Sequence, residues 1–200
     1  MAEPVEFWFD FSSPYGYLAA TRIEAIAAKH GRAVSWKPFL LGVAFKIAGT
    51  APLLDVPMKG AYSKHDFARS ARLLGVPFVL PASFPFSGLA ASRAFYWLDG
   101  RDKALAVRFA KAVYHQAFGE GRDVVGADKV AAIGESVGIA SAEMLAALND
   151  PAVKDRLKRE VDAGIAKGVF GSPFIFVDGE PFWGSDRLDQ VDRWLATGGW

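Results

Sequence analysis

The sequence VEFWFDFSSPYGYLA, residues 5–19, decides how the chain begins to fold. Its first part, Val5 to Phe11, is rich in aromatic and β-branched residues and predicts a strand. The following Ser-Ser-Pro is a helix-start signal, because Ser13 can cap a helix and Pro14 suits its first position. We expect this helix to end near Gly31 and a second strand to occupy residues 33–39. The opening therefore predicts a β-α-β unit.

The middle of the chain predicts helices and shows no strand alternation. Apolar residues recur at helical spacing in two stripes, and residues 127–137 form a shorter helix candidate. The stripes consist of Phe67, Ala71 and Leu74, and of Leu105, Phe109 and Val113. Gly49, Pro52 and Pro57 mark a linker that precedes this region.

The last fifty residues return to mixed elements. Asp150-Pro151 predicts the start of a helix that ends at Gly168, and residues 174–177 predict a strand. Asp178-Gly179 predicts a tight hairpin turn, and a final helix follows Asp186. The order is that of an α/β, thioredoxin-like domain, built from residues 1–56 and 150–200 and interrupted by a large all-helical insertion over residues 57–149.

Composition excludes several classes of function. Hydrophobic residues make up 52% of the 200 residues, so a packed core is expected, and the net charge of +1 provides no general attraction to nucleic acid. The chain has no cysteine, which excludes disulfides, Cys-x-x-Cys redox chemistry and thiolate zinc sites. Its three histidines, His30, His65 and His115, lie far apart, so we expect no metal site.

The sequence contains no segment that suits a membrane. The N-terminus lacks the basic and apolar regions of a secretory signal. The long uncharged stretch from Leu74 to Ser92 is interrupted by three prolines and does not predict a membrane span. We therefore expect a soluble, cytoplasmic protein with no membrane partner.

Ser13 has two interpretations. Serine is among the best N-cap residues, so it can serve the helix alone. Alternatively its hydroxyl points to a ligand beyond the helix end, where free N–H groups favour an anion. In thioredoxin-like proteins this is the position of the reactive cysteine.

The Ser172-Pro173 pair and the Trp183-Gly184-Ser185-Asp186 stretch also have two interpretations each. Pro173 is either an ordinary edge-strand proline or a cis-proline, which would turn the Ser172 backbone toward an extended peptide ligand. Ser185 or Asp186 either caps the last helix or helps to bind the carboxylate and ammonium of a ligand.

Three further residues are candidates for lining a cleft. Lys46 and Lys59 flank the Gly/Pro linker and are either solvated or bind carboxylates. Phe84 lies in a proline-rich loop, and such loops often line ligand sites.

Four stretches together resemble the 2-hydroxychromene-2-carboxylate isomerase family. They also resemble its relatives, the kappa-class glutathione transferases and the wider group of disulfide-oxidoreductase-A-like proteins. The stretches are FDFSSPYGYLA at 9–19, LLGVAFKIAG at 40–49, LLGVPFVLPASFP at 73–85 and GVFGSPFIFVDGEPFWGSDRL at 168–188. The chain departs from the family where it has Gly16 for serine, Thr50 for asparagine and Ser172 for a larger aliphatic residue.

The resemblance implies glutathione as the cofactor and Ser13 as the catalytic residue that holds its sulfur. It implies that the Ser172 backbone binds the cysteinyl unit. It also implies that the γ-glutamyl end is held by Trp183, Gly184, Ser185 and Asp186, and that the second substrate faces Lys46, Lys59 and Phe84. The partner it implies is a small aromatic keto acid, and the assembly a homodimer.

The leading hypothesis is a glutathione-dependent isomerase of aromatic catabolism, which interconverts 2-hydroxychromene-2-carboxylate and trans-o-hydroxybenzylidenepyruvate. The alternatives are a glutathione transferase that conjugates electrophiles and a binding protein that keeps the fold without catalysis. A disulfide oxidoreductase is excluded because no cysteine is available to cycle.

Overall fold

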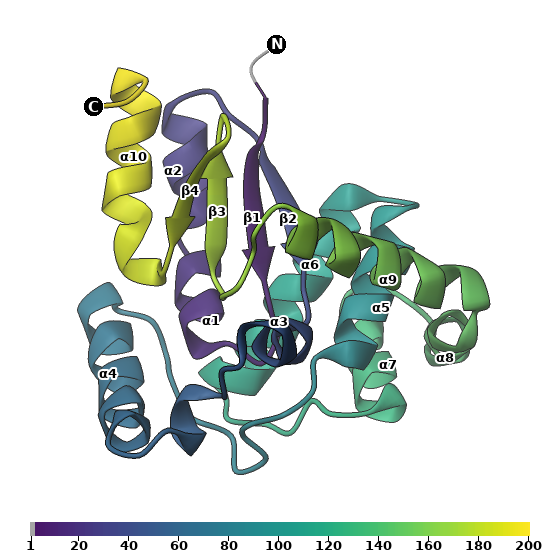
Figure 1. Ribbon diagram of the computed structural model, residues 1–200. Coiled ribbons are helices and arrows are strands. Elements are labelled where there is room, and N and C mark those ends of the chain that lie inside the picture. Colours follow the sequence, from purple (N-terminus) through teal and green to yellow (C-terminus); the bar gives the residue numbers. More distant parts are fainter. Residues whose placement is uncertain (1–2) are drawn as a thin grey trace.

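The centre of the protein is a four-stranded mixed sheet with the order β2-β1-β3-β4. The computed structural model describes residues 3–200, and Figure 1 shows the helices around this sheet. β1 pairs in parallel with β2 and antiparallel with β3, and β3 pairs antiparallel with β4. The strands are β1 (Val5–Phe9), β2 (Val34–Pro38), β3 (Phe174–Val177) and β4 (Glu180–Trp183).

Helices connect β2 to β3 over more than a hundred residues. The α-helices are α1 (Pro14–Ala20), α2 (Ile23–Lys29), α3 (Leu41–Ala48), α4 (Lys59–Leu74), α5 (Leu89–Asp99), α6 (Lys103–Tyr114), α7 (Ala127–Ser136), α8 (Ser141–Asn149), α9 (Pro151–Ala166) and α10 (Leu188–Thr197). Short turns of other helix types lie at η1 (Leu53–Asp55), η2 (His115–Gly119) and η3 (Ser185–Arg187). The predicted thioredoxin-like fold with a helical insertion is confirmed.

Several local predictions are confirmed. The Ser13 side chain caps α1, and the Asp150 side chain caps α9 through the N–H of Ala152. Asp178 and Gly179 both have positive φ, 51° and 93°, as a tight turn between two strands requires. The Ser172–Pro173 peptide bond is cis.

Other local predictions are wrong. The first helix does not continue to Gly31: α1 ends at Ala20 and α2 begins at Ile23. α3 was not predicted, because most of its eight residues are apolar and form no single stripe; only Ala44 among them is buried. Neither Ser185 nor Asp186 caps the last helix, since α10 begins at Leu188 and has no side-chain cap.

The sheet buries aromatic side chains on both faces. Phe9 lies against Phe95 of α5 and Tyr114 of α6. Trp8 points to the opposite face, where its indole and the Phe39 ring meet Gly164 of α9. On the edge near β4, α10 lies beside α2 (Figure 1).

One contiguous core joins the sheet and the inserted helices. It includes Phe9 of β1, Phe109 of α6 and Leu157 of α9. Because residues of both proposed domains share this core, it does not mark a boundary between them. The division into a domain of residues 1–56 and 150–200 and one of residues 57–149 stays a prediction. Among the described residues, no helix combines the length and the apolar character that a membrane span needs.

We predict that Gly164→Ala lowers the free energy of unfolding by about 1–3 kcal/mol. A Cβ at this position would lie 2.8 Å from Trp8 and 2.9 Å from Phe39, and this overlap outweighs the better helix propensity of alanine. Urea denaturation measures the change. Gly42→Ala in α3 is the control, because its Cβ would meet no atom within 4 Å; equal effects of the two substitutions would contradict the packing.

We predict that Asp178→Asn destabilises the protein at neutral pH by about 0.2–1 kcal/mol. The Arg32 guanidinium donates two hydrogen bonds to this carboxylate, at 3.0 and 2.6 Å, and lowers its pKa below the usual 3.8. A lowered pKa means that the ion pair stabilises the fold above the unfolded-state pKa and that this contribution is lost as the pH falls through the folded-state pKa. Asparagine also tolerates positive φ, so the turn is kept.

The measurement is the difference in unfolding free energy between the variant and the parent as a function of pH. The difference is expected to shrink on acidification. Asp55→Asn is the control, since Asp55 forms no ion pair within residues 3–200. A pH-independent difference for Asp178→Asn would contradict the role of the ion pair.

Candidate active site

Ser13 lies at the junction between the end of β1 and the start of α1, and only 6% of it is exposed. Its Oγ accepts a hydrogen bond from the Gly16 N–H at 3.0 Å and donates one to the Ser172 carbonyl at 2.9 Å. The hydroxyl is thus both a helix cap and a link to the segment before β3.

Ser172 faces Ser13 across this junction and is 8% exposed. Its Oγ accepts a hydrogen bond from the Asp10 N–H at 2.9 Å. Within residues 3–200 the Ser172 N–H donates no hydrogen bond. Ser172 therefore has a backbone donor that is unpaired among the described residues, and its carbonyl is hydrogen-bonded to Ser13.

Asp10, which sequence reasoning missed, is a buried carboxylate next to Ser13. Its Oδ1 accepts from the N–H and hydroxyl of Ser12 at 2.8 and 2.9 Å, and its Oδ2 accepts from the Leu41 N–H at 2.7 Å. Burial raises the pKa of the Asp10 carboxyl, whereas these hydrogen bonds act in the opposite direction. The side chain fixes the loop before Ser13 to the start of α3.

Gly16 leaves room for two hydroxyl groups behind Ser13. A Cβ at Gly16 would lie 2.5 Å from the Tyr114 hydroxyl and 2.9 Å from the Ser172 Oγ. The Tyr114 hydroxyl donates to the Asp10 carbonyl at 2.9 Å. In this chain, hydroxyl groups from two distant segments occupy the space that a larger residue at position 16 would need.

The stretch from Trp183 to Asp186 adjoins the Ser172-Pro173 segment. The Gly184 N–H donates to the Pro173 carbonyl at 3.1 Å, and the Trp183 indole lies against Gly171, where a Cβ would overlap it. Trp183 is 56% exposed, so its ring forms part of the surface there. The structure therefore brings Trp183 and Gly184 close to Ser172.

Ser13, Ser172, Trp183 and Gly184 form what we call the Ser13 cluster. Asp186 extends it toward α1. η3, which contains Ser185 and Asp186, packs against α1. Tyr15 of α1 donates to Asp66 of α4 at 2.6 Å, and burial together with the charges of Asp66 and Asp186 raises the pKa of the Tyr15 hydroxyl. Two carboxylates thus lie near Tyr15; the sequence alone gave no signal for Asp66, because α4 is remote in the chain.

Lys46 and Lys59 are not brought into the cluster by any hydrogen bond. Lys46 lies in the last turn of α3 and Lys59 is the first residue of α4; both are exposed, and neither forms an ion pair within the described part of the chain. Phe84 is half-buried and packs on Phe67, whose ring also contacts Tyr15 at a centroid distance of 4.9 Å. An aromatic group thus connects Phe84 with α1.

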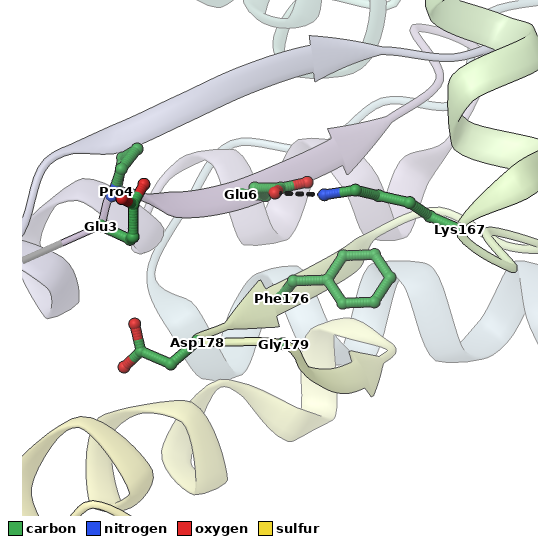
Figure 2. Close-up of a pocket in the computed structure, with 7 residues that line it drawn as sticks. All are labelled: Glu3, Pro4, Glu6, Lys167, Phe176, Asp178 and Gly179. Carbon is green, nitrogen blue, oxygen red and sulfur yellow. Dashed lines mark hydrogen bonds and ion pairs between the residues drawn. The ribbon is translucent and has the colours of Figure 1, made fainter.

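A separate cavity of about 360 Å³ lies at the opposite end of β1 (Figure 2). It lies between the ion pair of Glu6 with Lys167, the Phe176 ring and the Asp178-Gly179 turn. It contains no residue of the Ser13 cluster. In residues 3–200 no group of three or more histidine, aspartate or glutamate side chains could hold a metal ion.

Comparison with known proteins agrees with the thioredoxin-like fold. A family model described as the DsbA-like thioredoxin domain matches residues 4–196. The chain belongs to the DsbA-like thioredoxin family. The matched range covers nearly the whole chain.

Individual relatives show which members of this family the chain is similar to. The chain is 31% identical over 197 residues to a 2-hydroxychromene-2-carboxylate isomerase from Sphingobium xenophagum, covering 98% of this chain and 99% of the relative. It is 29% identical over 205 residues to glutathione S-transferase kappa 2 from Caenorhabditis elegans, covering 96% and 91%. A solved 2-hydroxychromene-2-carboxylate isomerase superposes with a TM-score of 0.86 at 29% identity, covering 96% and 94%. These similarities identify an enzyme of the isomerase type.

We predict that Gly16→Ala destabilises the protein by about 1–3 kcal/mol, because its Cβ would overlap the Tyr114 hydroxyl. Tyr114→Phe removes that hydroxyl together with its hydrogen bond to the Asp10 carbonyl. Denaturant unfolding of the two single variants and the double variant measures the coupling. We expect the double variant to be less destabilised than the sum of the singles by about 0.5–2 kcal/mol; strict additivity would contradict the close approach.

Proposed function

We propose that the protein is a glutathione-dependent isomerase that interconverts 2-hydroxychromene-2-carboxylate and trans-o-hydroxybenzylidenepyruvate. The observation that carries the proposal is the buried Ser13 hydroxyl beside the free Ser172 N–H. The names of the full-length relatives, isomerases and a kappa-class glutathione transferase, support both the reaction and the cofactor.

The groups around Ser13 fit glutathione, which is an extended peptide with a thiol, two carboxylates and an ammonium group. The Ser172 N–H is a backbone donor for the cysteinyl unit. Asp186 and Asp66 are carboxylates that suit the ammonium of the γ-glutamyl end, and Trp183 provides an exposed ring beside it. Ser185 and the Gly184 segment would complete this end of the site.

Bound glutathione would supply a thiolate that adds reversibly to the conjugated carbon of the ring-opened substrate, so that the former double bond can rotate. Ser13 would donate its hydroxyl proton to the sulfur as a hydrogen bond, not attack as a nucleophile. A hydrogen bond to a charged group contributes about 1.5–3 kcal/mol, which lowers a thiol pKa by about 1–2 units. At neutral pH a larger fraction of the bound thiol is then present as thiolate.

Lys46 and Lys59 would hold the substrate carboxylate and stabilise negative charge that develops on the adjacent oxygen. Their lack of ion pairs within residues 3–200 leaves both ammonium groups available. Phe84 would contribute an aromatic surface for the substrate ring. A homodimer and a cytoplasmic location remain part of the proposal.

The direct test is to incubate the protein with 2-hydroxychromene-2-carboxylate, with and without catalytic amounts of glutathione, and to follow the absorbance of the enone product. We expect turnover only with glutathione, and no consumption of glutathione. Absence of glutathione-dependent acceleration would refute the proposal. Stoichiometric loss of glutathione with an electrophile would instead support a transferase.

We predict that Ser13→Ala raises the pKa of the bound thiol by about 1–2 units and lowers kcat about 10- to 100-fold near neutral pH. Loss of the α1 cap also costs about 0.5–2 kcal/mol of stability, which leaves the variant folded if the parent has ordinary stability. The thiolate absorbance of bound glutathione, titrated with pH, measures the first effect. Ser87→Ala, at an exposed serine in the loop before α5, is the control; an unchanged thiol pKa in Ser13→Ala would contradict the role.

A further inference from the structure

The Ser13 hydroxyl has a single proton, and the structure shows where it is used. It is donated to the Ser172 carbonyl at 2.9 Å, while the oxygen accepts from the Gly16 N–H at 3.0 Å. Both of the contacts are buried. In this state the hydroxyl has no proton left for a sulfur atom.

The two backbone groups of Ser172 are in different situations. Its N–H donates to no group within residues 3–200, whereas its carbonyl already accepts from Ser13. A peptide ligand that pairs with this backbone through both groups meets a free donor and an occupied acceptor. The carbonyl has two lone pairs, so an incoming N–H can approach before the Ser13 hydrogen bond breaks.

When the Ser13 O–H turns from the Ser172 carbonyl to a thiolate, it forms a charge-assisted hydrogen bond. The same change leaves the buried Ser172 carbonyl without a donor unless the ligand provides one. An unsatisfied buried acceptor is costly. A thiol whose own chain carries an amide N–H at the right distance avoids that cost. The cysteinyl amide of glutathione is such a group.

We propose that ligand binding exchanges hydrogen bonds at Ser172. The amide N–H of a peptidyl thiol donates to the Ser172 carbonyl in place of the Ser13 hydroxyl, and the Ser13 hydroxyl then donates to the ligand's sulfur. The inference rests on the proposed glutathione site and adds a selection rule to it. The site lowers the thiol pKa of a peptidyl thiol by the full amount. It lowers the pKa of a thiol without that amide by less, even when this thiol binds at the same position.

The test compares glutathione with its depsipeptide analogue, in which an ester oxygen replaces the cysteinyl amide N–H. The pKa of each bound thiol is titrated by thiolate absorbance at saturating ligand, and each value is referred to the pKa of the same thiol free in solution. In the parent protein we expect the lowering of the thiol pKa to be about one unit larger for glutathione, about tenfold in thiolate fraction, because only glutathione compensates the Ser172 carbonyl.

Two variants make the comparison specific. In Ser13→Ala the difference between the two ligands is expected to vanish, since no hydroxyl proton remains to be exchanged. In Ser172→Ala the difference is expected to persist, because the variant keeps the backbone carbonyl and loses only the Oγ that accepts from Asp10.

The outcomes separate the exchange from the proposed function. Equal lowering of the thiol pKa for both ligands in the parent, or a ligand difference that survives Ser13→Ala, would overturn the exchange while the glutathione site stands. Failure of glutathione to bind, or binding with an unshifted thiol pKa, would overturn the proposed function and the exchange with it.

Discussion

A reciprocal pair of hydrogen bonds between residues far apart in the sequence holds the candidate site together. The Ser13 side chain donates to the backbone of Ser172, and the Ser172 side chain accepts from the backbone of Asp10. These contacts join the end of β1 to the segment that enters β3, at the point where the two strands pair antiparallel. Because Ser13 is also the N-cap of α1, the same contacts fix where this helix begins relative to the sheet.

Much of this arrangement could be predicted from local sequence. The strand before Ser13, the cap at Ser13, the Asp150-Pro151 start of α9 and the Asp178-Gly179 turn all depend on neighbouring residues, and all are present. Local signals failed where tertiary contacts decide. α3 has almost no buried residues, and its first N–H is bonded to Asp10, thirty-one positions away.

The polar groups behind Ser13 could not be predicted for the same reason. Tyr114 reads as one more aromatic residue on α6, yet its hydroxyl lies against Gly16 and bonds to the Asp10 carbonyl. Asp66 similarly reads as a solvated helix residue, yet it accepts from Tyr15. Each is recognised only when residues from separate helices are placed together, whereas Ser172 and Asp186 could be named because they lie in contiguous stretches typical of the family.

A serine at the start of α1 also changes how the protein responds to chemical stress. Oxidants and alkylating agents inactivate enzymes with a reactive cysteine by modifying its thiolate. The hydroxyl of Ser13 resists both reactions, and none of the 200 residues carries a thiol. Under the proposed function the reactive thiol belongs to glutathione, so oxidation or alkylation of that thiol would modify a replaceable small molecule and leave position 13 of the protein unchanged.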